Sequence, residues 1–273
     1  MRISFSTGCL IAYRWPMIFA IAREIGAGGL EFMLRPVGEP PSPAEIKSLA
    51  SEFGVPVLSV HPPVMLRSKG PDHFRPYEDA VRIALEIPTA ETVVFHMPRS
   101  PYRESGYGRL WYDMFDRCRK MVEGSHVRIA LENRSLSYKV RQFKHEYDDP
   151  VEIHRFARES GVAVTYDICH AATTGRSVVE TYKAVEDLVA DIHFSDMKAF
   201  PLPVKSTLFH SLVKQHQMPG HGCLPLRLFL EHLRSSGYSG PVTYELSPLA
   251  IRGWSYHTAK RKLQEAVEFC RNN

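Results

Sequence analysis

Short strand-like runs, in which bulky apolar residues alternate with small or polar ones, recur along the whole chain. Between them lie longer stretches whose apolar residues have the spacing of an amphipathic helix. The predicted order is therefore a strand followed by a helix, repeated eight times, which favours a closed parallel barrel. The strand-like runs begin near Ile3, Gly29, Val55, Thr92, Arg128, Ala163, Asp191 and Val242.

The predicted helices have recognisable ends. Ser42, Asp149 and Ser177 each stand three residues before a glutamate, which is the pattern of an N-cap with Glu at N3. No linker or change of composition divides the chain, so residues 1–273 are predicted to form a single domain. Glycines stand where left-handed residues would end helices, at Gly54, Gly124, Gly161 and Gly237.

Successive side chains of a strand point to opposite faces, and this parity separates the predicted strands into an apolar face and a polar face. In the fifth strand Ile129 lies on the apolar face and Glu132 on the other. Asp167, His193 and Glu245 occupy the same polar face of their own strands. We therefore expect these four polar residues to point toward the barrel axis. The same parity adds three more: Glu31, His61 and His96.

In barrels of this kind, the carboxyl-terminal ends of the strands form the mouth of the active site. Glu132, Asp167, His193 and Glu245 would share that mouth. A single inward His or Glu is more often a hydrogen-bonded structural residue, but three carboxylates that face one another repel unless protons or a cation compensate them. We therefore predict a divalent cation held by these four residues. His170, three residues after Asp167, could reach the same ion or its substrate.

Composition narrows the class of protein. Hydrophobic residues make up 44% of the 273-residue chain, yet no apolar run approaches the roughly 18 residues of a membrane span. The amino terminus enters a strand without the pattern of a secretory signal, so we expect a soluble, cytoplasmic protein. The net charge of +4 favours an anionic ligand without requiring nucleic acid.

Seven motifs together resemble a known family, the xylose isomerase-like barrels, which include sugar epimerases and isomerases and the apurinic endonuclease family 2. The resemblance covers nearly the whole chain and implies a single (β/α)8 TIM barrel with its active site at the carboxyl-terminal ends of the strands. It also implies that Glu132, Asp167, His193 and Glu245 are the metal ligands of the epimerases, with Glu132 and Glu245 as the acid/base pair. The motifs are SVHPP (59–63), FHMP (95–98), ALEN (130–133), YDICHA (166–171), IHFSD (192–196), HQMPGHG (216–222) and TYELS (243–247).

The endonucleases of this family bind additional zinc ions, and the resemblance matches His61, His96, His170 and His216 to ligands of those ions. These endonucleases have an aspartate two residues before the last of the four histidines, whereas this chain has Lys214. The departure argues against cleavage of abasic DNA. The predicted quartet suits Mn²⁺ or Mg²⁺, and recruitment of further histidines would favour Zn²⁺.

Two opposed glutamates permit proton transfer on a hydroxyketone sugar. One of Glu132 and Glu245 would remove the proton next to the carbonyl, giving an enediolate, and the other would return it. Return on the opposite face is epimerisation and return at the neighbouring carbon is isomerisation; the sequence leaves both open. A zinc-dependent phosphodiesterase and a catalytically silent metal- or sugar-binding barrel are the alternatives.

The expected partner is a small sugar or sugar phosphate, and the sequence does not predict the oligomeric state. Arg99 and Arg103 follow the fourth predicted strand, where basic side chains could bind a phosphate. Gly220 and Gly222 follow the seventh, where many barrels bind phosphate through backbone N–H groups. A solvated charged loop is an equal interpretation of the two arginines, and simple loop geometry is the first interpretation of the two glycines. Glu31 is expected to be structural, with support of a metal ligand or the capping of a helix as the alternatives.

Overall fold

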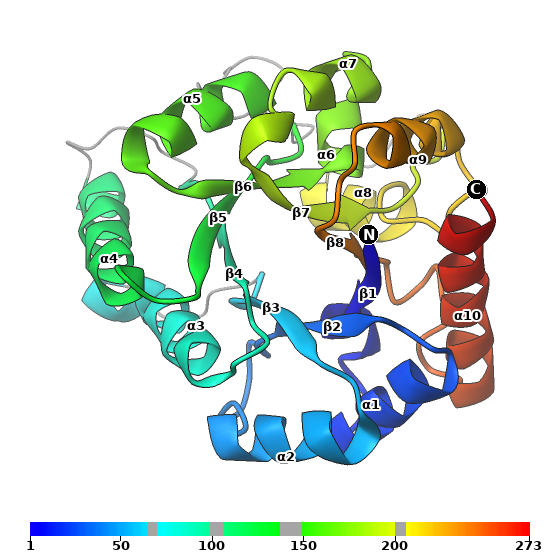
Figure 1. Cartoon of the computed structure of the whole chain (residues 1–273), viewed down its shortest axis with the longest axis horizontal. Helices are drawn as coiled ribbons and strands as arrows, with labels where there is room; N and C mark the ends of the chain where they lie inside the picture. The colour runs from blue at the N-terminus through cyan, green and yellow to red at the C-terminus, as the bar shows by residue number, and fades with distance from the viewer. Residues whose placement is uncertain (65–69, 99–105, 137–148, 200–205) are drawn as a thin grey trace.

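The chain forms a closed barrel of eight parallel strands with helices around it (Figure 1), as seen in a computed structural model. The strands follow one another around the ring in chain order, and β1 pairs with β8 to close it. The predicted (β/α)8 barrel is therefore confirmed. The structure describes residues 1–64, 70–98, 106–136, 149–199 and 206–273.

Each strand begins within two residues of its predicted start. Short strands suit this barrel because successive inward side chains fill its interior in layers. The strands are β1 (Arg2–Ser6), β2 (Gly29–Met33), β3 (Val57–His61), β4 (Thr92–His96), β5 (Arg128–Glu132), β6 (Ala163–Asp167), β7 (Val189–Phe194) and β8 (Pro241–Tyr244).

The helices connect the strands, and within the described ranges none is both long and apolar enough to cross a membrane. The α-helices are α1 (Trp15–Glu24), α2 (Pro43–Phe53), α3 (Arg75–Glu86), α4 (Gly106–Val122), α5 (Pro150–Ser160), α6 (Ile168–Ala172), α7 (Val178–Lys183), α8 (Thr207–Val213), α9 (Leu226–Ser235) and α10 (Tyr256–Asn272). Short 3-10 turns occur at η1 (Thr7–Leu10), η2 (Gly70–Phe74) and η5 (Glu186–Leu188).

The predicted helix caps are present. The Ser42 side chain accepts from the backbone of Glu45, whose own side chain accepts from the backbone of Ser42, so α2 begins with a complete capping box. The side-chain oxygens of Asp149 and Ser177 cap α5 and α7 by accepting from the backbone N–H groups of Val151 and Glu180. Gly54 ends α2 with φ 65°, a conformation that glycine adopts at little cost. Local signals therefore set the helix boundaries.

Large apolar side chains pack between the strand ring and the helices. In α4, Trp111 stacks on Phe115 with ring centroids 4.9 Å apart, and both are buried. Tyr166 of β6 stacks on Phe229 of α9 at 6.0 Å. The interior of the barrel is different, because polar side chains of β2 to β7 meet there. The apolar core therefore fixes the ring of strands, and the ring positions the polar residues.

Candidate metal centre

The four residues predicted to bind a metal come together at the mouth of the barrel. Glu132 and Asp167 are the last residues of β5 and β6, His193 lies one residue before the end of β7, and Glu245 follows β8 directly. One ligand atom from each lies within 4.8 Å of the others. Strand register contributes to this arrangement, since Asp167 pairs with His193 across β6 and β7. That the four bind a metal stays a prediction.

Glu132 lies at the middle of the centre, where its two carboxylate oxygens face four histidines. Its Oε1 atom lies 3.2 Å from Nδ1 of His193 and 3.3 Å from Nδ1 of His170. Its Oε2 atom lies 2.5 Å from Nε2 of His96 and 3.6 Å from Nε2 of His61. The register places His96 of β4 directly opposite Glu132. His61, His96 and Glu132 form a second group whose ligand atoms lie within 4.8 Å of one another.

Asp167, His170 and His216 form a third group at the same spacing. Asp167 is the N-cap of α6 and accepts from the backbone N–H of His170 at 2.5 Å, which holds both side chains at one place. His216 follows α8 with φ 52°, and its Nδ1 atom lies 3.7 Å from Oε2 of Glu245. Each of the outer groups therefore shares a carboxylate with the predicted quartet, so the mouth has donors for more than one ion.

The carboxylates and histidines perturb one another strongly. Burial would raise the pKa of Glu132, but His96 and His193 hold that pKa well below its usual range. Burial would lower the pKa of His170, but Asp167 and Glu132 raise it to about 10. Burial raises the pKa of Asp167 to about 6, despite the nearby histidines. The mouth therefore favours positive charge, which protons on the histidines or a cation can provide.

The donor atoms fit a divalent ion. Within the part of the chain that the structure describes, four buried atoms of the centre make no well-aligned hydrogen bond, although histidine nitrogens lie near two of them: Oε2 of Glu132 (2.5 Å from Nε2 of His96), Oδ2 of Asp167, Oε2 of Glu245 (3.3 Å from Nδ1 of His193) and Nε2 of His61. Leaving such a group unsatisfied costs about 1–3 kcal/mol each. An ion in the predicted quartet would be a partner for the three carboxylate oxygens, whereas Nε2 of His61 belongs to the separate group with His96 and Glu132. Mixed carboxylate and imidazole donors suit Mn²⁺ or Zn²⁺.

Gly220 and Gly222, for which loop geometry is the first interpretation and phosphate binding the second, donate within their own loop. The backbone N–H groups of Gly220 and Gly222 donate to Oδ2 of Asp196 at 3.0 and 2.9 Å. Two further backbone N–H groups donate to the other oxygen of this buried carboxylate. A phosphate would have to compete with Asp196 for these donors, so the geometry does not support the predicted role. Arg99 and Arg103 lie outside the described residues.

Two polar residues support the centre in ways that the sequence did not indicate. Asn133, directly after Glu132, donates to the backbone oxygen of Asp167 at 2.9 Å and accepts from its N–H at 2.8 Å. This pair of bonds clamps the ends of β5 and β6 together. Glu31, expected to be structural or to support a metal ligand, lies 3.0 Å from Nε2 of His193. The one feature of the sequence that could have indicated Asn133 is an amide residue directly after an inward glutamate at the end of a strand.

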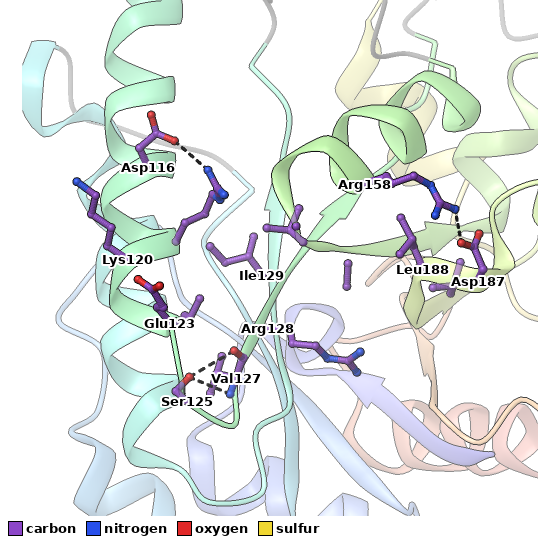
Figure 2. Close-up of a pocket in the computed structure, with 16 residues that line it drawn as sticks. Asp116, Lys120, Glu123, Ser125, Val127, Arg128, Ile129, Arg158, Asp187 and Leu188 are labelled. Carbon is purple, nitrogen blue, oxygen red and sulfur yellow. Dashed lines mark hydrogen bonds and ion pairs between the residues drawn. The ribbon is translucent and has the colours of Figure 1, made fainter.

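A separate cavity of about 770 Å³ opens at the opposite end of the barrel, where β5, β6 and β7 begin. Its charged side chains include ion pairs, and Figure 2 shows Arg158 directed at Asp187 and a second pair at Asp116. Ile129 and Leu188 contribute apolar wall. None of the four groups of possible metal ligands in the described residues lies among the residues that line this cavity. The candidate chemistry therefore belongs to the mouth.

The chain belongs to the xylose isomerase-like TIM barrel family, whose family model matches residues 19–273. The predicted family is thus confirmed. An uncharacterized protein of Mycobacterium leprae is 24% identical over 291 residues, which cover 99% of this chain and 97% of the relative.

Solved structures share the fold. D-Psicose 3-epimerase with D-tagatose from Clostridium cellulolyticum H10 has a TM-score of 0.69 at 15% identity, over 100% of this chain and 99% of the epimerase. The IolI protein with a bound zinc atom has a TM-score of 0.70 at 16% identity, over 98% of each chain.

Proposed function

We propose that the protein is a divalent-metal-dependent isomerase or epimerase of a small sugar or sugar phosphate. The observation that carries the proposal is the meeting of Glu132, Asp167, His193 and Glu245 within 4.8 Å at the barrel mouth. A structure of the same fold is that of an epimerase with D-tagatose, and another contains zinc. When bound, a divalent ion would supply Lewis acidity toward a carbonyl oxygen of the substrate.

The two glutamates would move the proton. The Glu245 side chain is 16% exposed, so this residue can be reached from the mouth, although its Oε2 atom is itself buried. Glu132 is fully buried among histidines on the other side of the centre. We assign removal of the proton next to the substrate carbonyl to Glu245, and its return to Glu132 or to Glu245 itself. Return by Glu132 on the opposite face would give the epimer.

A second candidate function is supported by the two outer groups of donors. His61 and His96 flank Glu132, and His170 and His216 flank Asp167, so the mouth has donors for three ions. Several ions could clamp a phosphodiester, as in a zinc-dependent endonuclease on abasic DNA. Lys214 is the C-cap residue of α8, two residues before His216, and stands where the endonucleases have an aspartate. A cation in that place disfavours a further metal, so this function ranks second.

The functions can be separated by metal content and by two assays. We expect one tightly bound divalent ion per chain, and incorporation of solvent deuterium into at least one member of a panel of ketoses and ketose phosphates. We expect no cleavage of abasic-site DNA above background with Zn²⁺, Mn²⁺ or Mg²⁺. Robust incision that disappears in His216→Ala would instead establish the second function. Bound metal with neither reaction would favour a catalytically silent binding barrel.

The remaining predictions also stay proposals. We propose that residues 1–273 act as one domain, in the cytoplasm, on a small-molecule partner rather than on nucleic acid. The match of the family model over residues 19–273 supports a single unit. The modest net charge of +4 and Lys214 are the observations against nucleic acid.

A further inference from the structure

His193 lies between two sets of carboxylates, one on each side of its ring. Its Nδ1 atom faces the mouth, 3.2 Å from Oε1 of Glu132 and 3.3 Å from Oε2 of Glu245. Its Nε2 atom faces the barrel interior, 3.0 Å from Oε2 of Glu31. A neutral imidazole carries its proton on one nitrogen and a lone pair on the other. Which nitrogen has the proton therefore decides whether His193 can bind a metal at the mouth.

Glu31 is placed to make that choice. It reaches His193 from β2, a strand that is not a neighbour of β7 in the ring. Glu31 is fully buried, and its other contact at Oε2 is the Ser59 hydroxyl, which donates at 3.5 Å. A buried carboxylate with so few donors is costly unless a strong donor faces it. The Nε2–H group of His193 is the short contact that Glu31 has.

We propose that Glu31 is a positioning residue of the metal centre. Its carboxylate accepts the Nε2–H of His193, which fixes the tautomer and the ring orientation and leaves the Nδ1 lone pair directed at the ion. The carboxylate also makes the imidazole a better donor. Loss of such a partner typically weakens metal affinity by about 10–100-fold. This inference rests on the metal site of the proposed function and adds a residue to it.

One competing arrangement uses the same atoms. One possible ligand atom from each of Glu31, Asp191 and His193 also lies within 4.8 Å of the others. A cation held there by Nε2, the nitrogen 3.0 Å from Glu31, would take the place of the Nε2 proton. Nδ1 would then carry the proton and donate to the carboxylates at the mouth. In a neutral imidazole the two arrangements exclude each other and differ in the protonated nitrogen. Oδ1 of Asp191 accepts from the Thr243 hydroxyl at 2.9 Å, whereas Oδ2 of Asp191 and Oε1 of Glu31 make no hydrogen bond within the described residues, so the position of the proton on His193 decides between the two arrangements.

The test is made on the full chain loaded with Zn²⁺. Long-range proton–nitrogen NMR spectra of histidine, assigned with a His193→Asn variant, should show Nδ1 of His193 bound to zinc and Nε2 protonated. Competition with a chelator should show a weakening of Zn²⁺ affinity by about 10–100-fold in Glu31→Ala. Glu31→Gln, which keeps an acceptor oxygen but loses the charge, should weaken the affinity less.

Asp191→Asn is the matched control, because it removes a buried carboxylate from the same region without removing the acceptor at Nε2. If only lost negative charge mattered, this variant would equal Glu31→Gln in Zn²⁺ affinity; we expect a smaller change. The urea midpoint of each metal-free variant reports any damage to the fold, and the wild-type spectrum decides the tautomer even if a variant does not fold.

A wild-type spectrum with Nε2 bound to zinc and Nδ1 protonated would overturn the role of Glu31. So would tight wild-type binding that is unchanged in both Glu31 variants, and these results would leave the proposed function intact. A wild type that binds no divalent ion would overturn both.

Discussion

Both ends of the barrel carry many charged side chains, but these side chains are exposed and paired at one end and buried and incompletely paired at the other. At the opposite end, Asp187 pairs with Arg158 and with His154 at 2.7 Å, and half of its side chain is exposed. At the mouth, Glu132 is fully buried among histidines, and its Oε2 atom makes no well-aligned hydrogen bond within the described residues, although Nε2 of His96 lies 2.5 Å away. Exposed ion pairs hydrogen-bond to each other and to water, so they need no further partner. A buried set of charged groups that is incompletely hydrogen-bonded indicates a ligand.

The largest effect should come from Glu245→Gln. The change keeps the size and one oxygen of the side chain but removes the base, so turnover should fall by about 10²–10⁴ while metal stays bound. The fall in turnover is measured as the rate at which solvent deuterium enters a converted ketose at saturating metal. Conversion must be followed in parallel, because a hydride shift would leave no label. Exchange that persists in both Glu245→Gln and Glu132→Gln would show that the proton moves elsewhere.

Two matched variants sharpen the contrast within the mouth. Glu132→Gln should reduce turnover and metal affinity together, because Glu132 contacts four histidines whereas Glu245 contacts two. Asp167→Asn should act mainly through loss of metal, so excess metal should restore part of its activity. If all three variants retained metal equally, the central role of Glu132 would be wrong.

The second effect is stabilisation by the ion itself. At free metal of 100 times the dissociation constant, binding to the folded chain alone should add about 2.7 kcal/mol to the free energy of unfolding. Urea unfolding before and after chelation measures this difference. Asp187→Asn, at the opposite end, should respond like the wild type, and Asp167→Asn should respond less. An unchanged midpoint after chelation would mean that the mouth needs no metal to be stable.

The sequence predicted the fold because the signals for it are local. Strand parity depends on nearest neighbours, and it placed Glu132, Asp167 and His193 on the axial face correctly. Caps such as Ser42 depend on a few successive residues. The convergence of the strand ends then follows from the barrel topology, so most of the candidate centre was within reach of the sequence.

What the sequence did not predict depends on side-chain reach across the barrel. Glu31 meets His193 between strands that are not adjacent, and no local pattern specifies such a contact. The two glycines after β7 indicated exposed N–H groups, but only the structure shows that Asp196 takes them. A motif therefore identified donors without identifying their acceptor.

The third effect concerns this loop, where a mouth carboxylate is fully satisfied. A Cβ atom on Gly222 would lie 2.2 Å from Oδ1 of Asp196 and 2.4 Å from the backbone oxygen of Met197. Gly222→Ala should therefore lower the free energy of unfolding by about 1–3 kcal/mol, the usual cost of overpacking. Gly106→Ala is the control, since a Cβ there meets nothing within 4 Å. Equal urea midpoints for both variants would mean that the loop shifts to accommodate the added methyl group at little cost in stability.

The smallest effect should come from Asp187→Asn at the opposite end. Burial alone would raise the pKa of Asp187, but His154 and Arg158 lower it below its usual value. Because the folded-state pKa is lowered, the pair stabilises the protein above the unfolded pKa of about 3.9, and this contribution disappears as pH falls through the folded-state pKa. Solvent screens the half-exposed pair, so we expect a loss of only about 0.2–1 kcal/mol at pH 7.

Urea unfolding of wild type and Asp187→Asn checks this expectation at pH 7 and at a pH below the unfolded pKa of about 3.9, with and without 1 M salt. The difference should shrink at the lower pH and in salt, because salt at that concentration screens charges beyond about 3 Å. Zn²⁺ affinity should be the same in both proteins. A cost of several kcal/mol, or a change in metal affinity, would show that the two ends of the barrel are not independent, and the contrast between paired and metal-requiring charges would then fail.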